Sequence, residues 1–385
     1  MIPHALPLAL ALTLTQHPRA WDAFTRAFDT FLSQDSVMGG AAVLVREGRI
    51  IAHYERGMAD RERREPITER SIFHYGSITK TLTAVAILQL RDRGLLSLDD
   101  TVTHWIPELR QLRNRFGSMD AITVRMLLSH SSGFQNPTWP YRRHPWQPFE
   151  PTRWDQLVAM MPYQEVLFAP GSRYGYSNPA FIYLARILEL ITGDPYQSYV
   201  YKNIWTPLGM HRSYFGASPY HLAAERSNNY TLELDSSGRE RMAANGREFD
   251  PGITIPNGGW NAPLADVAVW AAFLTEAAGD DPALRRRYET VLRRSSLEEM
   301  WRMVVPVGGE GAETMGLSFF LRPVRGTTLV GHTGEQAGFR SLLYFNRDTR
   351  EAVIAAVNTT NDAHPRESAA RWRSLLVATA DVLVP

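Results

Sequence analysis

The sequence contains no cysteine and only two lysines, Lys80 and Lys202, among its 385 residues. Without cysteine the chain cannot form disulfides, use a thiol nucleophile or hold zinc through thiolates. Its formal net charge is +1, which gives no basic surplus for binding nucleic acid or an anionic membrane surface. No apolar run reaches the roughly 18 residues of a membrane span. We therefore expect a globular protein without a nucleic-acid partner or a transmembrane helix.

Several catalytic signatures are also missing. The sequence has no Gly-x-Ser-x-Gly, so the nucleophile turn of an α/β-hydrolase is not supported. His-Glu-x-x-His and Gly-x-x-x-x-Gly-Lys are absent as well, and the histidines are scattered. His130 is expected only to bond locally in its loop. We therefore expect neither a metal nor a cofactor.

Residues 5–14 form a short apolar stretch near the N-terminus. The stretch resembles a signal-peptide core, with Ala-Leu-Ala at residues 9–11 as a poor cleavage site. No lysine or arginine precedes it, which favours an uncleaved segment and a cytoplasmic over a periplasmic or secreted location. The pattern does not identify the compartment further.

The hydrophobic periodicity predicts strands at both ends of the chain. An amphipathic helix over residues 20–32 is followed by a hairpin, with strands at 41–46 and 50–54. Four further strands, at 317–321, 327–331, 339–346 and 352–358, are expected to form an antiparallel meander, which a helix over 368–383 follows. Between them lie mostly helical segments, among them 179–192 and 264–277.

These elements predict an α/β (α+β) fold in which one antiparallel sheet is built from both chain ends and flanked by helices. Residues 16–84 and 262–385 are expected to form the sheet domain, and residues 85–261 an inserted, mostly helical domain. We expect the active site in the cleft between the two domains.

The stretch Ser77-Ile78-Thr79-Lys80 precedes an apolar run at helical spacing, residues 82–90. We expect Ser77 to be the first residue of a buried helix, so that Lys80, three positions on, lies on the same face. A serine hydroxyl is a poor nucleophile until a neighbour takes its proton, and a buried lysine with a lowered pKa can do so. The alternative is an ordinary helix start with an exposed lysine.

Residues 137–154 form a long stretch without periodicity that is dense in proline and aromatic residues: Trp139, Tyr141, Trp146, Phe149 and Trp154. One interpretation is an ordered surface loop fixed by its aromatic side chains. The other is a wall or lid over a site that prefers apolar substrate groups.

Three motifs occur in order along the chain, together with flanking phrases: Ser77-Ile78-Thr79-Lys80, Leu127-Leu128-Ser129-His130-Ser131-Ser132-Gly133, Pro170-Gly171-Ser172, Tyr176-Ser177-Asn178, Pro207-Leu208-Gly209-Met210 and His332-Thr333-Gly334. This combination resembles the serine β-lactamase and penicillin-binding-protein superfamily, in its class C-like branch. That branch also contains family VIII carboxylesterases and D-alanyl-D-alanine carboxypeptidases. The resemblance covers nearly the whole chain. Tyr201-Lys202-Asn203 also fits the second motif, but only Tyr176 follows the Pro-Gly-Ser turn.

The resemblance implies that Ser77 forms an acyl-enzyme. Lys80 and Tyr176 together are expected to remove the Ser77 proton and to deliver it to the leaving group. A phenol is a poor base in water, and a nearby ammonium group is expected to lower the pKa of Tyr176. The sequence leaves open which of the two is the formal base.

The same resemblance assigns the substrate-binding residues. Asn178 is expected to hold an acyl-side group of the substrate and to orient Lys80, while Thr333 bonds a substrate carbonyl or carboxylate. Gly334 allows close backbone approach, and the N–H groups of Ser77 and Glu335 are expected to form the oxyanion hole. Two positions depart from the β-lactamase pattern: His332 replaces the frequent lysine, and Glu335 stands where small residues are common.

The predicted function is a serine hydrolase that acts on a small-molecule ester or amide, with carboxylic esters favoured by His332 and the aromatic loop. The alternatives are a β-lactamase, a D-alanyl-D-alanine carboxypeptidase or aminopeptidase, an acyltransferase, and a catalytically silent binding module on the same scaffold. The sequence does not indicate the oligomeric state.

Overall fold

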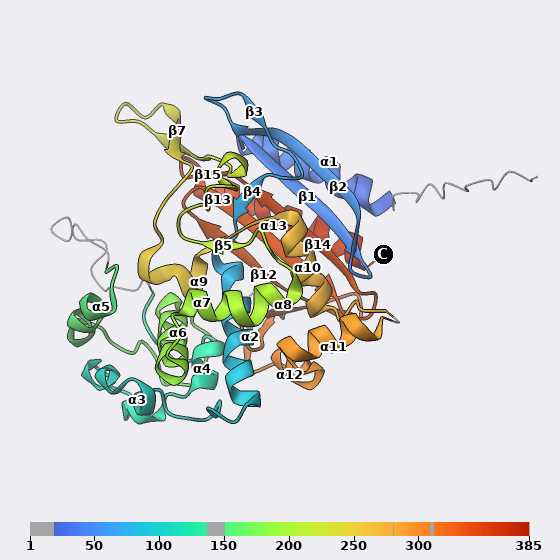
Figure 1. Ribbon diagram of the computed structural model, residues 1–385. Helices are drawn as coiled ribbons and strands as arrows, with labels where there is room; N and C mark the ends of the chain where they lie inside the picture. The colour runs from blue at the N-terminus through green and yellow to red at the C-terminus, as the bar shows by residue number, and fades with distance from the viewer. Residues whose placement is uncertain (1–18, 137–150, 280, 309–311, 385) are drawn as a thin grey trace, which may run out of the picture.

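The computed structural model describes residues 19–136, 151–279, 281–308 and 312–384. At its centre is a nine-stranded sheet with the order β3-β2-β1-β14-β13-β12-β11-β10-β9 (Figure 1). Each neighbouring pair is antiparallel. The strands are β1 (Gly39–Arg46), β2 (Arg49–Asp60), β3 (Glu65–Pro66), β9 (Val305–Pro306), β10 (Thr314–Met315), β11 (Phe320–Val324), β12 (Thr327–Gln336), β13 (Phe339–Asn346) and β14 (Glu351–Val357).

The two ends of the chain meet where β1 pairs with β14, as the sequence predicts. Ala42 lies opposite Ala355 in this pairing. Both strands are buried along almost their whole length. Because the sheet is covered on both faces, the sequences of these strands are continuously apolar and do not alternate between apolar and polar residues. The predicted hairpin and the predicted antiparallel meander are both confirmed.

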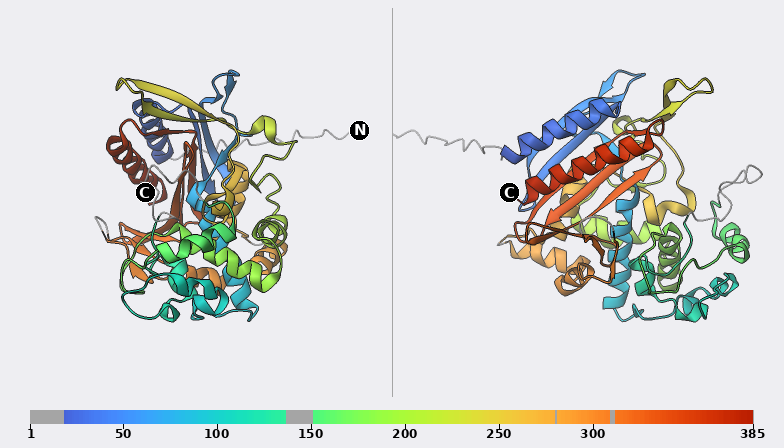
Figure 2. Two further views of the ribbon diagram at one scale, coloured as in Figure 1. Left: turned by 90° about the vertical axis from the view of Figure 1, so that its left-hand side faces the viewer. Right: turned by 180° about the vertical axis from the view of Figure 1, so that it is seen from behind.

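Helices cover both faces of the sheet. On one face, α1 (Arg19–Gln34) and α13 (Pro365–Leu383) lie side by side (Figure 2). Their apolar sides join the sheet in one core that includes Phe24, Phe28, Leu342 and Trp372. On the other face, α10 (Leu264–Leu274) packs on β1 and β14. A second core, which includes Leu343, continues from this face into the helical part of the molecule.

The helical part surrounds α2 (Thr79–Asp92), which is buried continuously from Thr79 to Leu90. A helix that is enclosed on all sides needs no polar face, which explains the dense apolar run after Ser77. The other helices are α3 (Val102–Trp105), α4 (Val124–Leu128), α5 (Trp154–Met160), α6 (Asn178–Thr192), α7 (Tyr196–Val200), α8 (Thr206–Leu208), α9 (Ile255–Gly258), α11 (Pro282–Val291) and α12 (Arg294–Met300).

Two small sheets combine strands from the middle of the chain with β4, which precedes the helical part, and β15, which follows β14. One has the order β15-β6-β7 and the other β4-β8-β5. Their strands are β4 (Ile72–His74), β5 (Tyr214–Phe215), β6 (Asn229–Leu234), β7 (Glu240–Gly246), β8 (Trp260–Pro263) and β15 (Thr359–Asn361). Residues 85–261 are therefore not purely helical, and the division of the chain into two domains stays a prediction.

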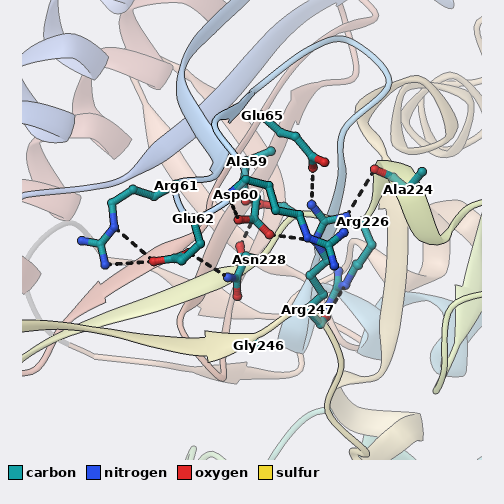
Figure 3. Close-up of polar contacts among 12 residues, drawn as sticks. Ala59, Asp60, Arg61, Glu62, Glu65, Ala224, Arg226, Asn228, Gly246 and Arg247 are labelled. Carbon is teal, nitrogen blue, oxygen red and sulfur yellow. Dashed lines mark hydrogen bonds and ion pairs between the residues drawn. The ribbon is translucent and has the colours of Figure 1, made fainter.

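An ion-pair cluster connects the segment after β7 to the end of β2 (Figure 3). Arg247 Nε lies 2.9 Å from Asp60 Oδ2, and the same guanidinium bonds Glu65 on β3. The carboxylate of Asp60 is almost completely buried. The β6–β7 hairpin is therefore fixed to the large sheet by charged hydrogen bonds as well as by its pairing with β15.

One strand begins later than the sequence indicates. The pattern predicts a strand at 317–321, but β11 begins only at Phe320. Ser318 has a φ of 69°, which is outside the extended region, and Gly316 N–H donates to Phe319 O across a tight turn. The apolar residues before β11 are buried by this turn rather than by a strand.

The apolar stretch at residues 5–14 and residues 137–150 of the aromatic loop lie outside the described residues. Of that loop, Trp154 is described, as the first residue of α5. Among the described helices, none combines the length and the apolar character needed to cross a bilayer.

Candidate active site

Ser77 lies in a single 3₁₀ turn, Gly76–Ile78, and the α-helix that was expected to begin at Ser77 begins at Thr79. Gly76 is the first residue of this turn. It has a φ of 49°, and a Cβ on it would come within 2.8 Å of the backbone nitrogen of Glu335. The turn is therefore pressed against β12, and Ser77 is presented between this strand and the start of α2.

Lys80 is buried beneath the half-buried Ser77, as the spacing predicts. Its Nζ lies 3.0 Å from Ser77 Oγ and 2.7 Å from the carbonyl oxygen of Asn257 on α9. Within the described ranges no carboxylate forms an ion pair with this amine. Burial lowers the pKa of Lys80 well below its usual value, because the charged form loses hydration. Lys80 is thus suited to hold a neutral amine beside the hydroxyl.

Tyr176 lies on the other side of this pair. Its ring is 5.0 Å from Lys80 Nζ, and its hydroxyl forms a hydrogen bond with Ser77. Burial raises the pKa of the phenol above its usual value, although the bond to Ser77 acts in the opposite direction. The expected lowering by a nearby ammonium group is therefore wrong, because desolvation of the phenolate dominates. Tyr176 is held as a protonated phenol.

The sequence predicted that Asn178 orients Lys80, and the structure shows a different contact. Asn178 begins α6, and its buried side-chain oxygen has no hydrogen-bond partner among the described residues. Lys80 is bonded instead by the carbonyl of Asn257, whose amide reaches Asn178 O at 3.4 Å. Nothing in the sequence pattern distinguishes Asn257, because it acts through its main chain.

His332 on β12 is buried and neutral. Its Nδ1 bonds the carbonyl of Thr333, so the ring proton lies on Nδ1 and Nε2 is an acceptor. Nε2 has no partner in the described part of the chain. Burial is the main cause that lowers the pKa of His332 to about 3; a protonated Lys80 would act in the same direction, and the bond to Thr333 acts in the opposite one. His332 therefore provides no positive charge at neutral pH.

The side chain of Glu335 points away from Ser77. Its carboxylate is exposed and lies 2.7 Å from Arg340 Nε on the neighbouring strand. Arg340 also bonds Ser368 on α13 and lies 4.0 Å from the buried carboxylate of Asp35. By strand alternation, Glu335 and the half-exposed Thr333 lie on the α1–α13 face, opposite Gly334. Only the backbone of Glu335 faces the turn that carries Ser77.

His130, which was expected only to bond locally in its loop, lies against Tyr176. Their rings stack with centroids 4.2 Å apart.

Among the described residues, no group of three or more His, Asp and Glu side chains could hold a metal ion.

Comparison with known proteins gives the family. The model of the "Beta-lactamase" family matches residues 24–378. The chain belongs to the beta-lactamase family. The resemblance drawn from the three motifs is therefore confirmed, and the fold is the β-lactamase/transpeptidase fold.

The chain is similar to proteins whose names indicate different activities. Esterase EstB from Burkholderia gladioli is 31% identical over 273 residues, which are 66% of this chain and 68% of EstB. A D-stereospecific amidohydrolase from Streptomyces sp. is 25% identical, with a TM-score of 0.70 over 93% of this chain and 98% of its own. A class C β-lactamase is 18% identical, with a TM-score of 0.72 over 95% of this chain and 96% of its own, and shows likeness of fold alone.

Proposed function

We propose that this protein is a serine hydrolase that cleaves carboxylic esters through an acyl-enzyme on Ser77. The observation that carries the proposal is the 3.0 Å contact between Ser77 Oγ and the buried amine of Lys80. An amine without a carboxylate counterion in the described surroundings, and with a lowered pKa, can accept the serine proton at neutral pH.

In the first step, neutral Lys80 takes the proton of Ser77 while Oγ bonds to the ester carbonyl carbon. The carbonyl oxygen becomes an oxyanion, and Lys80 becomes an ammonium group. The backbone N–H groups of Ser77 and Glu335 are proposed to bind the oxyanion, in keeping with the close packing of Gly76 against Glu335.

In the second step, the carbon–oxygen bond to the leaving alcohol breaks. Tyr176 donates its phenolic proton to the departing oxygen and is reprotonated by the Lys80 ammonium. Water then attacks the acyl-enzyme, its proton passes to the Lys80–Tyr176 pair, and Ser77 recovers a proton as the acid leaves. The lowered pKa of Lys80 suits the base, and the raised pKa of Tyr176 keeps the phenol protonated, so that it has a proton to give to the more basic departing alkoxide.

Preference for esters is supported by the likeness to esterase EstB and by His332. β-Lactams and D-Ala-D-Ala peptides carry a carboxylate, and a neutral His332 is a weak anchor for it. Asn178 remains the proposed contact for the acyl-side group of the substrate. The side chain of Thr333 lies on the α1–α13 face of the sheet, so we do not propose that its hydroxyl bonds the substrate.

Amide hydrolysis is the second candidate. It uses the same acyl-enzyme, and the likeness to the D-stereospecific amidohydrolase favours it. Acyl transfer to an alcohol or amine differs only in the group that replaces water. A silent binding module is disfavoured by the assembled Ser77, Lys80 and Tyr176.

A substrate panel tests the proposal. It contains short and long p-nitrophenyl esters, a D-amino acid amide, a chromogenic cephalosporin and a D-Ala-D-Ala peptide, each with wild type and Ser77→Ala. We expect ester turnover that disappears in Ser77→Ala. Turnover of only the cephalosporin or the peptide contradicts the ester assignment, and equal rates with Ser77→Ala contradict the acyl-enzyme.

A further inference from the structure

Tyr176 lies in a segment that has no regular secondary structure of its own. Residues 173–177 belong neither to a helix nor to a strand, and α6 begins only at Asn178. No hydrogen-bonded ladder therefore fixes the direction of the Tyr176 ring. Ser77 and Lys80, in contrast, are fixed by the 3₁₀ turn and by α2. The position of the phenol must come from contacts with another part of the chain.

His130 supplies three of these contacts. Its carbonyl accepts a hydrogen bond of 2.8 Å from the N–H of Gly175, the residue before Tyr176. Its ring Nδ1 accepts one of 3.1 Å from the N–H of Ser177, the residue after. Its ring stacks on the Tyr176 ring, with centroids 4.2 Å apart and planes 27° apart. His130 therefore contacts the backbone on both sides of Tyr176 as well as the Tyr176 ring.

The state of His130 fits this role. It is fully buried, and its ring also packs 5.1 Å from that of Phe181 on α6. Because Nδ1 accepts, the ring proton lies on Nε2, which has no hydrogen-bond partner within the described ranges. Burial lowers the pKa of His130 well below its usual value, and protonation of Lys80 or His332 would lower it further. The ring therefore stays neutral, and Nδ1 stays an acceptor, at neutral pH.

The backbone of His130 is also in an unusual conformation. Its φ of 54° lies in the left-handed region, which costs a non-glycine residue about 1 kcal/mol. Glycine, or asparagine for its tolerance of this conformation, would fit the turn with less strain. Neither would supply both a ring that stacks and an acceptor nitrogen. The strain and the unpartnered Nε2 both indicate that histidine serves something other than the stability of this loop.

We infer that His130 is the positioning residue of the proposed ester hydrolysis: it holds the Tyr176 hydroxyl at Ser77 without touching the substrate itself. This inference rests on the proposed function, since it gives Tyr176 the role of proton donor to the leaving group. The His130 ring sets the plane of the phenol, and its two acceptors set the backbone that carries it. Loss of either lets the hydroxyl move, and a shift of about 1 Å can cost about 100-fold in rate.

Two variants separate the ring from the acceptor. His130→Phe keeps an aromatic ring but loses the Nδ1 acceptor. His130→Asn loses the ring, but its side-chain oxygen can accept from Ser177 N–H, and asparagine tolerates a positive φ. The control is His104→Phe, at an exposed histidine that packs against Trp105 outside this site. Each protein is assayed for kcat and KM with a p-nitrophenyl ester, and its melting temperature is measured.

We expect both His130 variants to lose kcat, by about 10- to 100-fold, with KM within about twofold of wild type. The asparagine variant should retain the higher kcat, because the Ser177 bond is restored. The rate at which a fluorophosphonate labels Ser77 should change less than kcat, since its fluoride leaving group needs less protonation than an alkoxide. Variants that are folded at the assay temperature and keep kcat within twofold of wild type overturn the inference.

A crystal structure of each variant gives a readout that does not depend on activity. The inference requires the Tyr176 hydroxyl to leave Ser77 in His130→Phe and to stay closer in His130→Asn. An unmoved hydroxyl in both variants overturns it. The proposed function fails separately, if wild type neither turns over esters nor is labelled at Ser77, whatever the position of Tyr176.

Discussion

The carbonyl oxygen of Tyr75 occupies the space that a side chain on Gly334 would need. A Cβ on Gly334 would lie only 1.9 Å from this oxygen, which also accepts a 3.0 Å hydrogen bond from Ser341 Oγ on β13. Tyr75 directly precedes the 3₁₀ turn that carries Ser77. The nucleophile is therefore positioned by the sheet as well as by the helix that follows it.

Gly334→Ala should consequently move the turn and impair both stability and activity. We expect destabilisation of about 1–3 kcal/mol, typical of overpacking, and a loss of kcat beyond what unfolding explains. Thermal unfolding and ester turnover measure the two effects. The matched control is Gly238→Ala, in open space at a φ of 80°, which should cost about 1 kcal/mol without changing kcat. Full activity of Gly334→Ala contradicts this packing.

Lys80→Arg tests the amine as a base, because arginine keeps its positive charge at every working pH. We expect kcat to fall by about 100- to 10,000-fold, the usual contribution of a general base. Lys202→Arg is the control, since Lys202 is the other lysine of the chain, is exposed and pairs with Asp194 at 2.8 Å. If Lys80→Arg hydrolyses esters as fast as Lys202→Arg does, Lys80 is not the base.

The lowered pKa of Lys80 predicts the acidic side of the pH profile. Neutral Lys80 is the active form, so kcat/KM should rise with pH through the pKa of Lys80 in the folded enzyme. That pKa lies well below the 10.5 of a free lysine side chain. A series of initial rates, with circular dichroism at each pH as the check on folding, gives the profile. Activity that rises only near pH 10 or above is the contrary result.

Arg247→Met should destabilise the protein at neutral pH by about 3 kcal/mol, because it leaves the buried carboxylate of Asp60 unpaired. Burial tends to raise the pKa of Asp60, but hydrogen bonds from Arg63 N–H and Arg247 together lower it below its usual value. The stabilisation is therefore present above the pKa of unfolded aspartate, about 4, and is lost as the pH falls through the lower folded value.

Denaturant unfolding at pH 7 and at pH 3 measures this dependence. The difference between wild type and Arg247→Met should shrink at the lower pH. Arg239→Met is the control, because Arg239 is largely exposed and its pair with Asp235 should contribute less than about 1 kcal/mol. A difference that is equally large at both pH values would contradict the role of the ionised carboxylate.

The parts of the site that depend on local spacing follow from the sequence. Ser77 and Lys80 are three positions apart at a helix start, so their contact needs little beyond helical geometry. Tyr176 was identified by its motif and does reach Ser77. The sheet was predictable because its strands are long apolar runs separated by turn residues, and β1 and β14 have no polar face that could suggest another placement.

The features that the sequence did not reveal depend on contacts between distant segments. Asn257 bonds Lys80 through a backbone carbonyl, which every residue type offers. The pKa of Tyr176 rises because protein encloses the phenol, and composition does not report such enclosure. The sequence suggested a conflict between the bulky side chain of Glu335 and the oxyanion hole. Its ion pair with Arg340, the cross-strand neighbour, places that side chain on the opposite face of the sheet. His130 lies in the motif at residues 127–133, but its stacking on Tyr176 could not be predicted without the three-dimensional structure.

Trapping the acyl group tests the central claim most directly. The enzyme is mixed with excess p-nitrophenyl butyrate, quenched in acid during turnover, and analysed by intact mass and peptide mapping. We expect one butyryl group on the peptide that contains Ser77, and none in Ser77→Ala. Steady hydrolysis by wild type with butyryl found only on another residue would contradict the account.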